Sequence, residues 1–321
     1  SIMPNYQGVW SLSTQYQNRT GWPAPLGDVG LIFGNNEGTK LASISRINIA
    51  SSGNAFDFGD MSSAKGNSAA LGSATRGVIG GGNDGSPLNV IEFVTFAATG
   101  SVTDFGDLTE TANFPSGAAN STRGIFAALG TLTSSSGANK IEYITIASAG
   151  NSTDFGDLTL ARSMNDNGLT STTRAVFCGG YDGSNRSNVM DYITIGSTGN
   201  ATDFGDLTVG RNAGGATSSS TRGIIGGGYS SSGAVNTIDY ITIGSTGNAT
   251  DFGDLTSVRY SLGGTSNSTT GVFCGGNSGS AALNIIEQVT IASTGNATDF
   301  GDLDVARSMG AACSGSHGGL S

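Results

Sequence analysis

The chain has 321 residues, of which 53 are glycine, and a formal net charge of −10 at pH 7. Its 14 lysine and arginine residues form no cluster, which argues against a nucleic-acid-binding surface. No apolar run reaches the roughly 18 residues of a membrane-spanning helix, so we expect no membrane insertion. The first residues lack the basic and apolar segments of a Sec-type signal peptide, and Ser1 fits a cytosolic product that has lost its initiator Met.

Residues 1–28 are predicted to form an arm that lies outside the domain that follows. The arm holds both tryptophans of the chain, Trp10 and Trp22, together with Tyr6 and Tyr16. Trp and Tyr are typical of the core of a protein interface, and so short a segment cannot form a core of its own. Two interpretations stay open: the arm packs on its own domain, or it attaches the protein to another subunit or a larger assembly.

The rest of the chain repeats a segment with the sequence Asp-Phe-Gly-Asp. Its six copies begin at Asp57, Asp104, Asp154, Asp203, Asp251 and Asp299. The period of about 48 residues suits a propeller blade of four strands. Apolar stretches recur in register with the glycines, and no long stretch has helical periodicity. We therefore predict an all-β fold, a six-bladed β-propeller of four-stranded blades over residues 29–321.

The fifth repeat illustrates the four strands that we expect in each blade. They are named a to d from the inside outward, and they cover residues 214–219, 222–228, 238–244 and 249–255. The glycines that end strand b give the chain freedom at positive φ. In the Asp-Phe-Gly-Asp segment, we expect the Phe to fill the space between blades, the Gly to mark a bulge or turn, and the Asp side chains to cap backbone amides.

The two ends of the repeat region indicate how the propeller closes. The first repeat begins at strand b, over residues 30–34, and has no strand a of its own. After the sixth strand d, residues 308–315 have the small-residue composition of a strand a. We predict that this C-terminal strand completes the first blade, which would remove the open sheet edges.

The end of strand b and the residues after it resemble the kelch repeat, which is marked by a double glycine and then an aromatic residue. The glycines are Gly81 and Gly82, Gly179 and Gly180, Gly226 to Gly228, and Gly275 and Gly276, and the aromatic residues are Phe93, Tyr143, Tyr192 and Tyr240. The kelch tryptophan is absent. We expect the Phe of the repeated segment (Phe58, Phe105, Phe155, Phe204, Phe252, Phe300) to take its place. The resemblance is to the broad kelch-like class and implies a propeller.

A second resemblance covers nearly the whole chain. Residues 5–17 (Asn-Tyr-Gln-Gly-Val-Trp-Ser-Leu-Ser-Thr-Gln-Tyr-Gln) and repeats of the type Ile-Glu-Tyr-Ile-Thr-Ile-Ala-Ser are similar to proteins encoded by marine tailed bacteriophages. This resemblance implies a virion structural protein, such as a fibre, an appendage or a capsid decoration. It also implies synthesis in the host cytoplasm and contacts with other virion proteins through the arm. It provides no catalytic residue.

The loops between strands b and c differ most among the repeats and are the candidate ligand-binding region. Equivalent loops of a propeller gather on one face, and their Tyr, Asn, Asp and Arg side chains suit sugar binding by stacking and paired hydrogen bonds. The candidate residues are Tyr181, Asp182, Asn185, Arg186, Tyr229, Asn83 and Asp84. The alternative is that these residues serve only the turns in which they lie.

Three sets of charged residues recur at matched positions of the repeats. A cation follows five of the six repeated segments, at Lys65, Arg162, Arg211, Arg259 and Arg307. An acid lies on strand c at Glu92, Glu142, Asp191, Asp239 and Glu287, and Arg76, Arg123, Arg174 and Arg222 begin strand b. We expect structural ion pairs between strands or blades. The alternative is a site for an anion or an acidic sugar.

Catalysis and metal binding have little support in the sequence. The one histidine is His317, and there is no Gly-x-Ser-x-Gly elbow in a suitable context. The aspartates lack the spacing of a calcium loop, so we expect no metal and no cofactor. Cys178 and Cys274 occupy the same position of two repeats and Cys313 lies near the end; we expect small buried side chains.

The sequence thus predicts a non-enzymatic virion protein that displays a propeller for attachment or for binding a host-surface glycan. Self-association of the protein is compatible with this interpretation. The alternative is a soluble or cell-surface carbohydrate-binding lectin. A glycan hydrolase is the third possibility, because acidic residues are plentiful.

Overall fold

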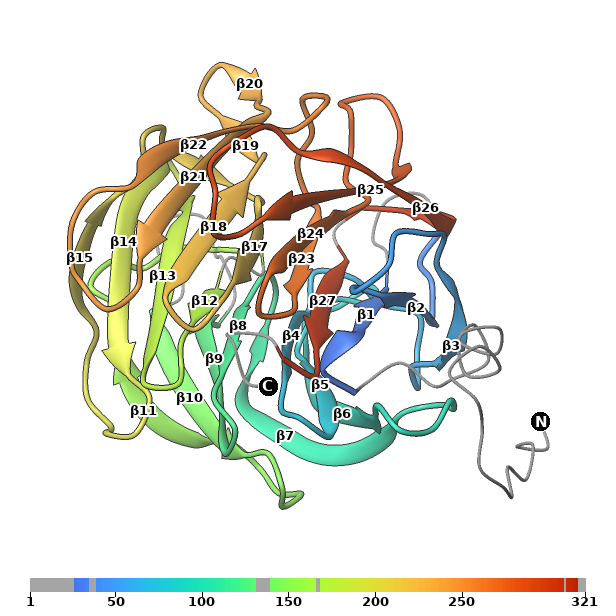
Figure 1. Cartoon of the computed structure of the whole chain (residues 1–321). Helices are drawn as coiled ribbons and strands as arrows, with labels where there is room; N and C mark the ends of the chain where they lie inside the picture. The colour runs from blue at the N-terminus through green and yellow to red at the C-terminus, as the bar shows by residue number, and fades with distance from the viewer. Residues whose placement is uncertain (1–25, 35–38, 131–138, 166–167, 309, 317–321) are drawn as a thin grey trace, which may run out of the picture.

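The computed structural model describes residues 26–34, 39–130, 139–165, 168–308 and 310–316. Within these residues the fold is all-β, with one 3-10 turn, η2 (Leu26–Asp28), and no α-helix (Figure 1). The described strands form six four-stranded antiparallel sheets and one small three-stranded sheet. The expected all-β, propeller-like architecture is confirmed.

Each four-stranded sheet has the strand order a, b, c, d. Sheet 1 contains β27 (Ala311–Ser314), β1 (Val29–Phe33), β2 (Ser43–Asn48) and β3 (Phe56–Asp60). Sheet 2 contains β4 (Ala69–Gly72), β5 (Arg76–Gly80), β6 (Leu88–Thr95) and β7 (Thr103–Ala112). Sheet 3 contains β8 (Ser116–Ala119), β9 (Arg123–Leu129), β10 (Lys140–Thr145) and β11 (Thr153–Asp157).

The remaining sheets continue the same order. Sheet 4 contains β12 (Gly168–Thr170), β13 (Arg174–Tyr181), β14 (Arg186–Thr194) and β15 (Thr202–Asp206). Sheet 5 contains β17 (Gly215–Ser218), β18 (Arg222–Gly226), β21 (Thr237–Thr242) and β22 (Thr250–Asp254). Sheet 6 contains β23 (Gly263–Ser266), β24 (Thr270–Cys274), β25 (Leu283–Thr290) and β26 (Thr298–Arg307). The three-stranded sheet contains β16 (Arg211–Asn212), β19 (Tyr229–Ser230) and β20 (Gly233–Ala234).

Strand β27 comes from the C-terminal region of the chain but pairs with β1. The register places Phe33 opposite Ala311 and Gly30 opposite Ser314. The turn η2 lies at the same junction, because the Ser316 hydroxyl donates to the carbonyl of Gly27 (2.5 Å) and Asn267 donates to the carboxylate of Asp28 (2.8 Å). The last three residues of the predicted arm therefore contact the sheets, whereas residues 1–25 lie outside the described part.

The inner strands contact one another in the order β27, β4, β8, β12, β17, β23 and again β27 (Figure 1). Their residues are small because the main chains approach closely. A Cβ added to Gly117 would lie 2.2 Å from the carbonyl oxygen of Ala70, and one added to Gly264 would lie 2.2 Å from that of Ala216. These close contacts explain the Gly, Ala, Ser and Thr composition of strand a.

The hydrophobic core is divided among the spaces between neighbouring sheets. Six clusters of buried side chains each join residues of two adjacent sheets. Phe58 of sheet 1, for example, belongs to the same cluster as Ile79 and Phe96 of sheet 2. Every Phe of the repeated segment is only 2–3% exposed. The prediction that this Phe fills the space between blades is confirmed.

The repeated segment also joins the outer strand of one sheet to the turn between strands c and d of the next. At all six junctions, a glycine N–H of that turn donates to the carbonyl of the Phe: Gly53 to Phe300, Gly100 to Phe58, Gly150 to Phe105, Gly199 to Phe155, Gly247 to Phe204 and Gly295 to Phe252. The register shifts at this segment, which confirms the expected bulge. The main-chain carbonyl of the second Asp accepts a further hydrogen bond from a backbone N–H of this turn. The backbone amides that we expected the Asp side chains to cap are thus bonded by the Asp main chain.

The segment that enters a sheet runs from the outer strand of the previous sheet to the inner strand of its own. Buried ion pairs link this segment to strand c of the sheet that it enters. Their N–O distances are 2.6 Å for Lys65–Glu92, 2.8 Å for Arg162–Asp191, 3.0 Å for Arg211–Asp239 and 2.6 Å for Arg259–Glu287. All eight side chains are almost completely buried. The predicted structural ion pairs are confirmed for these four sheets.

Sheets 1 and 3 vary this arrangement. In sheet 1 a serine, Ser45, stands in place of the acid and accepts a hydrogen bond from Arg307 (2.6 Å), while its hydroxyl donates to Asp304. In sheet 3 the cation is replaced by Ala112, and the buried Glu142 accepts hydrogen bonds from Thr109 and Ser152 instead. In both sheets, the charged residue that lacks its ion-pair partner, Arg307 or Glu142, thus has other polar partners.

The arginines that begin strand b do not form the ion pairs that we expected. Each stacks on the aromatic residue of strand c, with the Arg76 guanidinium carbon 4.5 Å from the ring centre of Phe93 and that of Arg123 4.3 Å from Tyr143. Each also donates to a main-chain carbonyl of the next sheet, as Arg76 does to Ile146 (2.8 Å). Arg174 and Arg222 repeat both contacts. These arginines therefore act as cation–π and hydrogen-bonding links between sheets.

The close outer contact predicts that Gly253→Ala destabilises the protein. The new Cβ would lie 2.5 Å from the carbonyl oxygen of Gly295 at a φ of +147°. We expect a loss of roughly 1–3 kcal/mol in the free energy of unfolding, measured by denaturant titration. Gly244→Ala is the control because a Cβ there has no neighbour within 4 Å. Equal stability of the two variants would contradict this role of the glycine.

The buried pairs predict that Arg162→Met destabilises the protein by about 3–5 kcal/mol, because Asp191 would remain buried without its cation. The double variant Arg162→Met/Asp191→Leu is expected to regain most of that loss, because neither charge is left unpaired. Glu110→Gln is the control, since the Lys140–Glu110 pair is partly exposed and its loss should cost less than about 1 kcal/mol. A double variant as unstable as the single one would contradict the pairing.

Candidate functional site

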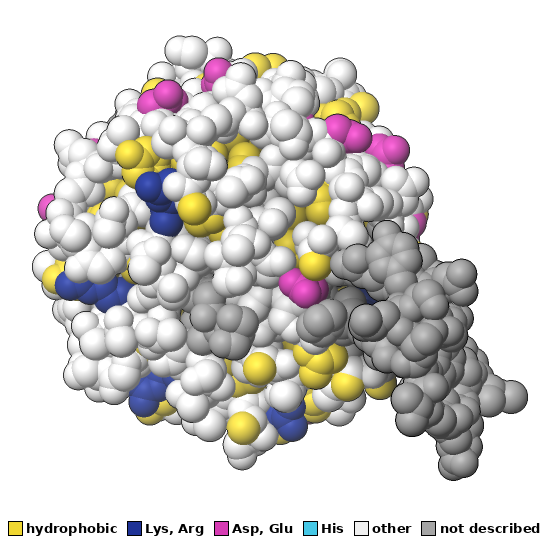
Figure 2. Space-filling model, in the orientation of Figure 1, with side chains coloured by type: hydrophobic (Ala, Val, Ile, Leu, Met, Phe, Trp, Pro, Cys, Tyr) yellow, Lys and Arg dark blue, Asp and Glu magenta, His cyan; other side chains and the backbone are white. Residues whose placement is uncertain are grey.

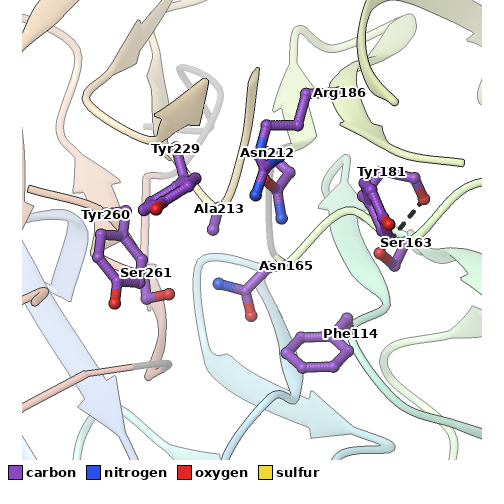
Figure 3. A pocket seen from close by; sticks show the side chains of 10 residues that line it. All are labelled: Phe114, Ser163, Asn165, Tyr181, Arg186, Asn212, Ala213, Tyr229, Tyr260 and Ser261. Atoms are coloured by element: carbon purple, nitrogen blue, oxygen red, sulfur yellow. Dashed lines mark hydrogen bonds between the residues drawn. The ribbon is translucent and has the colours of Figure 1, made fainter. Parts of the chain in front are cut away.

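A hollow of about 380 Å³ opens where the segments that enter sheets 3 to 6 meet the b–c loops of sheets 4 and 5. We call it the tyrosine–arginine pocket. Its lining residues are Phe114, Ser163, Asn165, Tyr181, Arg186, Asn212, Ala213, Tyr229, Tyr260 and Ser261 (Figure 3). Figure 2 shows one face of the molecule, on which most of the surface is neutral and the charged side chains form small, separate groups.

Main-chain pairing positions the polar residues of this pocket. Ser163 and Tyr181 exchange two backbone hydrogen bonds of 2.9 Å, so the segment before β12 is joined to the end of β13. In the same way, Asn212 of β16 lies opposite Tyr229 of β19. Tyr181 and Arg186 face each other across the β13–β14 hairpin. The side chains of the pocket are therefore held by paired strands and not by free loops.

Four of the lining residues are non-glycine residues with positive φ. The angles are +65° at Phe114, +64° at Asn165 and +57° at both Ala213 and Ser261. These residues occupy equivalent places, where the chain turns from the outer strand of one sheet to the inner strand of the next. The left-handed conformation is unfavourable for most side chains, with Asn as an exception, and is often found at functional sites. Its repetition around the pocket shows that the turns share one geometry.

Arg186 lies among aromatic rings. Its guanidinium carbon is 4.5 Å from the ring centre of Tyr229 and 5.7 Å from that of Tyr181. Tyr229 meets Tyr260 edge to face, with ring centres 5.0 Å apart and planes at 81°. Figure 3 shows Tyr229 and Tyr260 on one side of the pocket and Tyr181 on the other, with Arg186 and Asn212 between them. This arrangement offers flat apolar surfaces beside one cation.

The charge of Arg186 is not neutralised within the described part of the chain, where no carboxylate lies within 4.0 Å of its side-chain nitrogens. Its Nε is buried and has no hydrogen-bond partner there, and the same holds for Oδ1 of Asn212. A buried polar atom without a partner is costly unless water or a ligand satisfies it. The pocket therefore has the polar groups of a binding site.

The structure brings together three of the seven predicted ligand residues, Tyr181, Arg186 and Tyr229. Asp182 and Asn185 belong to the turn beside the pocket but do not line it. The carboxylate of Asp182 accepts hydrogen bonds from the backbone N–H groups of Asn185 (2.6 Å) and Ser184 (2.8 Å), and these bonds lower its pKa. For these two residues the structure thus displays turn chemistry.

Asn83 and Asp84 lie in the equivalent loop of sheet 2 and do not line the pocket either. Oδ1 of Asn83 accepts hydrogen bonds from the Lys40 ammonium (3.1 Å) and from the Gly85 N–H (2.9 Å). Asp84 accepts a long bond of 3.4 Å from the Ser86 N–H. These contacts also stabilise a turn.

Sequence reasoning missed the residues that precede the inner strands: Phe114, Ser163, Asn165, Asn212, Ala213, Tyr260 and Ser261. A signal was available for three of them, because Ser163, Asn212 and Tyr260 directly follow Arg162, Arg211 and Arg259. The positive-φ turns that bring these segments to the pocket have no glycine to mark them in the sequence.

The remaining candidates either lie outside the described residues or are buried in the core. Tyr6, Trp10, Tyr16 and Trp22 of the arm, and His317, lie outside the described residues. Cys178, Cys274 and Cys313 are buried as expected, and burial raises the pKa of Cys274 to about 12, so its thiolate is disfavoured.

Within the described residues, no group of three or more His, Cys, Asp or Glu side chains is arranged to hold a metal ion. The expectation of no metal and no cofactor stays a prediction. Among the same residues, no helix has the length and apolar character needed to cross a membrane.

Comparison with models of known protein families found no match, and comparison with curated protein sequences found none either.

Proposed function

We propose that the six four-stranded sheets are the blades of a closed six-bladed β-propeller of the kelch-like class. The pairing of β27 with β1 supports closure on the inside, and the hydrogen bond from Gly53 of sheet 1 to Phe300 of sheet 6 supports it on the outside. The double glycines support the likeness to kelch repeats, since Gly179, Gly180, Gly275 and Gly276 all have φ between +62° and +122°. Such a ring is a rigid base for a binding surface.

We further propose that the protein is a non-enzymatic virion component that binds a saccharide on the host surface. The observation that carries the binding role is the tyrosine–arginine pocket, where Tyr181, Tyr229 and Tyr260 surround Arg186 and unsatisfied polar atoms. Tyr rings pack against the apolar face of a sugar, while amides and a guanidinium form hydrogen bonds with its polar groups. The pocket lies within the size range of small-molecule sites.

The proposed place on a phage particle rests on the sequence resemblance and on the aromatic arm. Residues 1–28 would attach the protein to other virion proteins, and the propeller would present the pocket outward. Several copies on one particle would add their weak contacts as avidity. A soluble or cell-surface lectin would use the same pocket without a particle, so the two functions differ in the partner of the arm.

The binding role predicts that Tyr229→Ala lowers the affinity for the saccharide that binds best on a glycan array by about tenfold or more, because a stacking surface is lost. The measurement is calorimetry on the purified protein with that saccharide. Phe56→Ala is the matched control, since Phe56 is an aromatic residue 49% exposed and outside the pocket. No binding on the array, or an equal loss in both variants, would contradict the proposed site.

The virion role predicts that the full-length protein is found on purified particles and that a form without residues 1–25 is not. Residues 26–28 are kept in this variant because they contact the sheets. Mass spectrometry and cryo-electron microscopy of the particles measure the outcome, and an unchanged unfolding transition of the truncated protein is the control for folding. If neither form is on particles, the virion role is wrong and the lectin function becomes the proposal.

A further inference from the structure

We propose that the saccharide bound in the tyrosine–arginine pocket carries a carboxylate, and that Arg186 binds this group while the sugar ring lies against Tyr229 and Tyr260. This inference rests on the proposed function, because it specifies the chemical class of the ligand at the same site. It assigns Arg186 as the residue that distinguishes acidic from neutral sugars.

Arg186 differs from the arginines that stabilise the fold. Arg162, Arg211 and Arg259 pair with carboxylates, and Arg76 and its equivalents donate to main-chain carbonyls. Arg186 has aromatic neighbours but neither kind of partner among the described residues, although a guanidinium has five N–H donors. A guanidinium with neither a carboxylate nor a main-chain carbonyl as partner is available for a ligand.

The contact of Arg186 with Tyr229 leaves the hydrogen-bonding groups of the arginine unused. The guanidinium carbon lies over the ring, 4.5 Å from its centre, and a cation–π contact depends on the charge of the guanidinium and uses none of its five N–H donors in a hydrogen bond. Two parallel N–H donors along one edge match the two oxygens of a carboxylate. Stacking therefore holds the side chain without using the donors that a planar anion needs.

The rest of the pocket suits the hydroxyl groups of the same sugar. Oδ1 of Asn212 is a buried acceptor without a donor, and a sugar hydroxyl can supply one. The side chain of Asn165 lies between Phe114 and the upper part of the pocket (Figure 3), where its amide can donate and accept. A ring with hydroxyls and one carboxylate thus satisfies both orphaned atoms, whereas a neutral sugar has only hydroxyls to offer the cation.

The net charge of the protein limits how acidic the ligand can be. With a formal charge of −10, the protein repels a long polyanion, and this repulsion is screened only beyond about 8 Å at physiological salt. One positive side chain in a hollow of about 380 Å³ fits one charged sugar residue. The geometry points to a short or terminal carboxylated sugar and not to a densely charged polymer.

The test measures binding of the full chain to a glycan array that contains carboxylated sugars, their carboxyl-reduced forms and sulfated neutral sugars, followed by calorimetry on the best ligand. We expect a carboxylated sugar to bind at least about tenfold more tightly than its carboxyl-reduced form. Arg186→Gln should remove that preference. Arg46→Gln should keep it, because Arg46 stacks on Phe56, outside the pocket, and its loss changes the net charge equally.

The possible outcomes separate this inference from the proposed function. Binding of neutral and carboxylated sugars with equal affinity, lost in Tyr229→Ala but kept in Arg186→Gln, would overturn the carboxylate and leave the saccharide site standing. A preference for sulfated sugars would overturn the carboxylate as well. A preference for carboxylates that survives Arg186→Gln would place their site elsewhere. No binding on the array would overturn both proposals.

Discussion

Contact between neighbouring sheets through their main chains is the constraint on which this structure depends. At every junction, the glycine of the repeated Asp-Phe-Gly-Asp segment approaches the glycine of the next turn so closely that no side chain fits between them. The Phe beside that glycine is thereby placed in the space between the sheets, where its burial contributes to the core. One four-residue segment thus sets both the spacing of the sheets and the filling of the gap.

The buried ion pairs fix the position of the chain where it enters a sheet. Each of them ties the segment entering a sheet to strand c of the same sheet, so the incoming chain is held in one position before the inner strand begins. Buried pairs contribute little net stability, because desolvation offsets the attraction, but an unpaired member is costly. In sheets 1 and 3 the remaining charged residue also has polar partners. Arg307 donates a hydrogen bond to Ser45, which in turn donates to Asp304, and Glu142 accepts hydrogen bonds from Thr109 and Ser152.

Much of the fold could be predicted from the sequence because the repeat is long, regular and marked by residues with few conformational options. The strands, the Phe between the sheets and the buried ion pairs all follow from that pattern. The role of Arg76 could not be predicted, because the sequence does not give the short distance between Arg76 and Phe93 that makes the cation–π contact. The acid on strand c with which we expected Arg76 to pair, Glu92, pairs with Lys65 instead.

The pocket was predictable only in part. Loop variability pointed to Tyr181, Arg186 and Tyr229, but the same reasoning selected Asp182 and Asn83, whose side chains are used within their turns. Sequence alone cannot separate a polar residue that bonds to its own loop from one that faces a ligand. The other half of the pocket comes from the segments before the inner strands, where only Ser163, Asn212 and Tyr260 had a signal in the sequence, and the positive-φ turns of these segments have no glycine to mark them.

The order of residues in the segments that enter the sheets has a consequence for how this molecule can evolve. Arg162, Arg211 and Arg259 face inward to their carboxylates, while the next residues, Ser163, Asn212 and Tyr260, face the pocket. The residues that stabilise the fold and the residues that line the pocket are therefore encoded by adjacent codons. A single nucleotide change can alter the lining of the pocket and leave the neighbouring ion pair in place, so the surface chemistry of such a protein can change while its fold is kept.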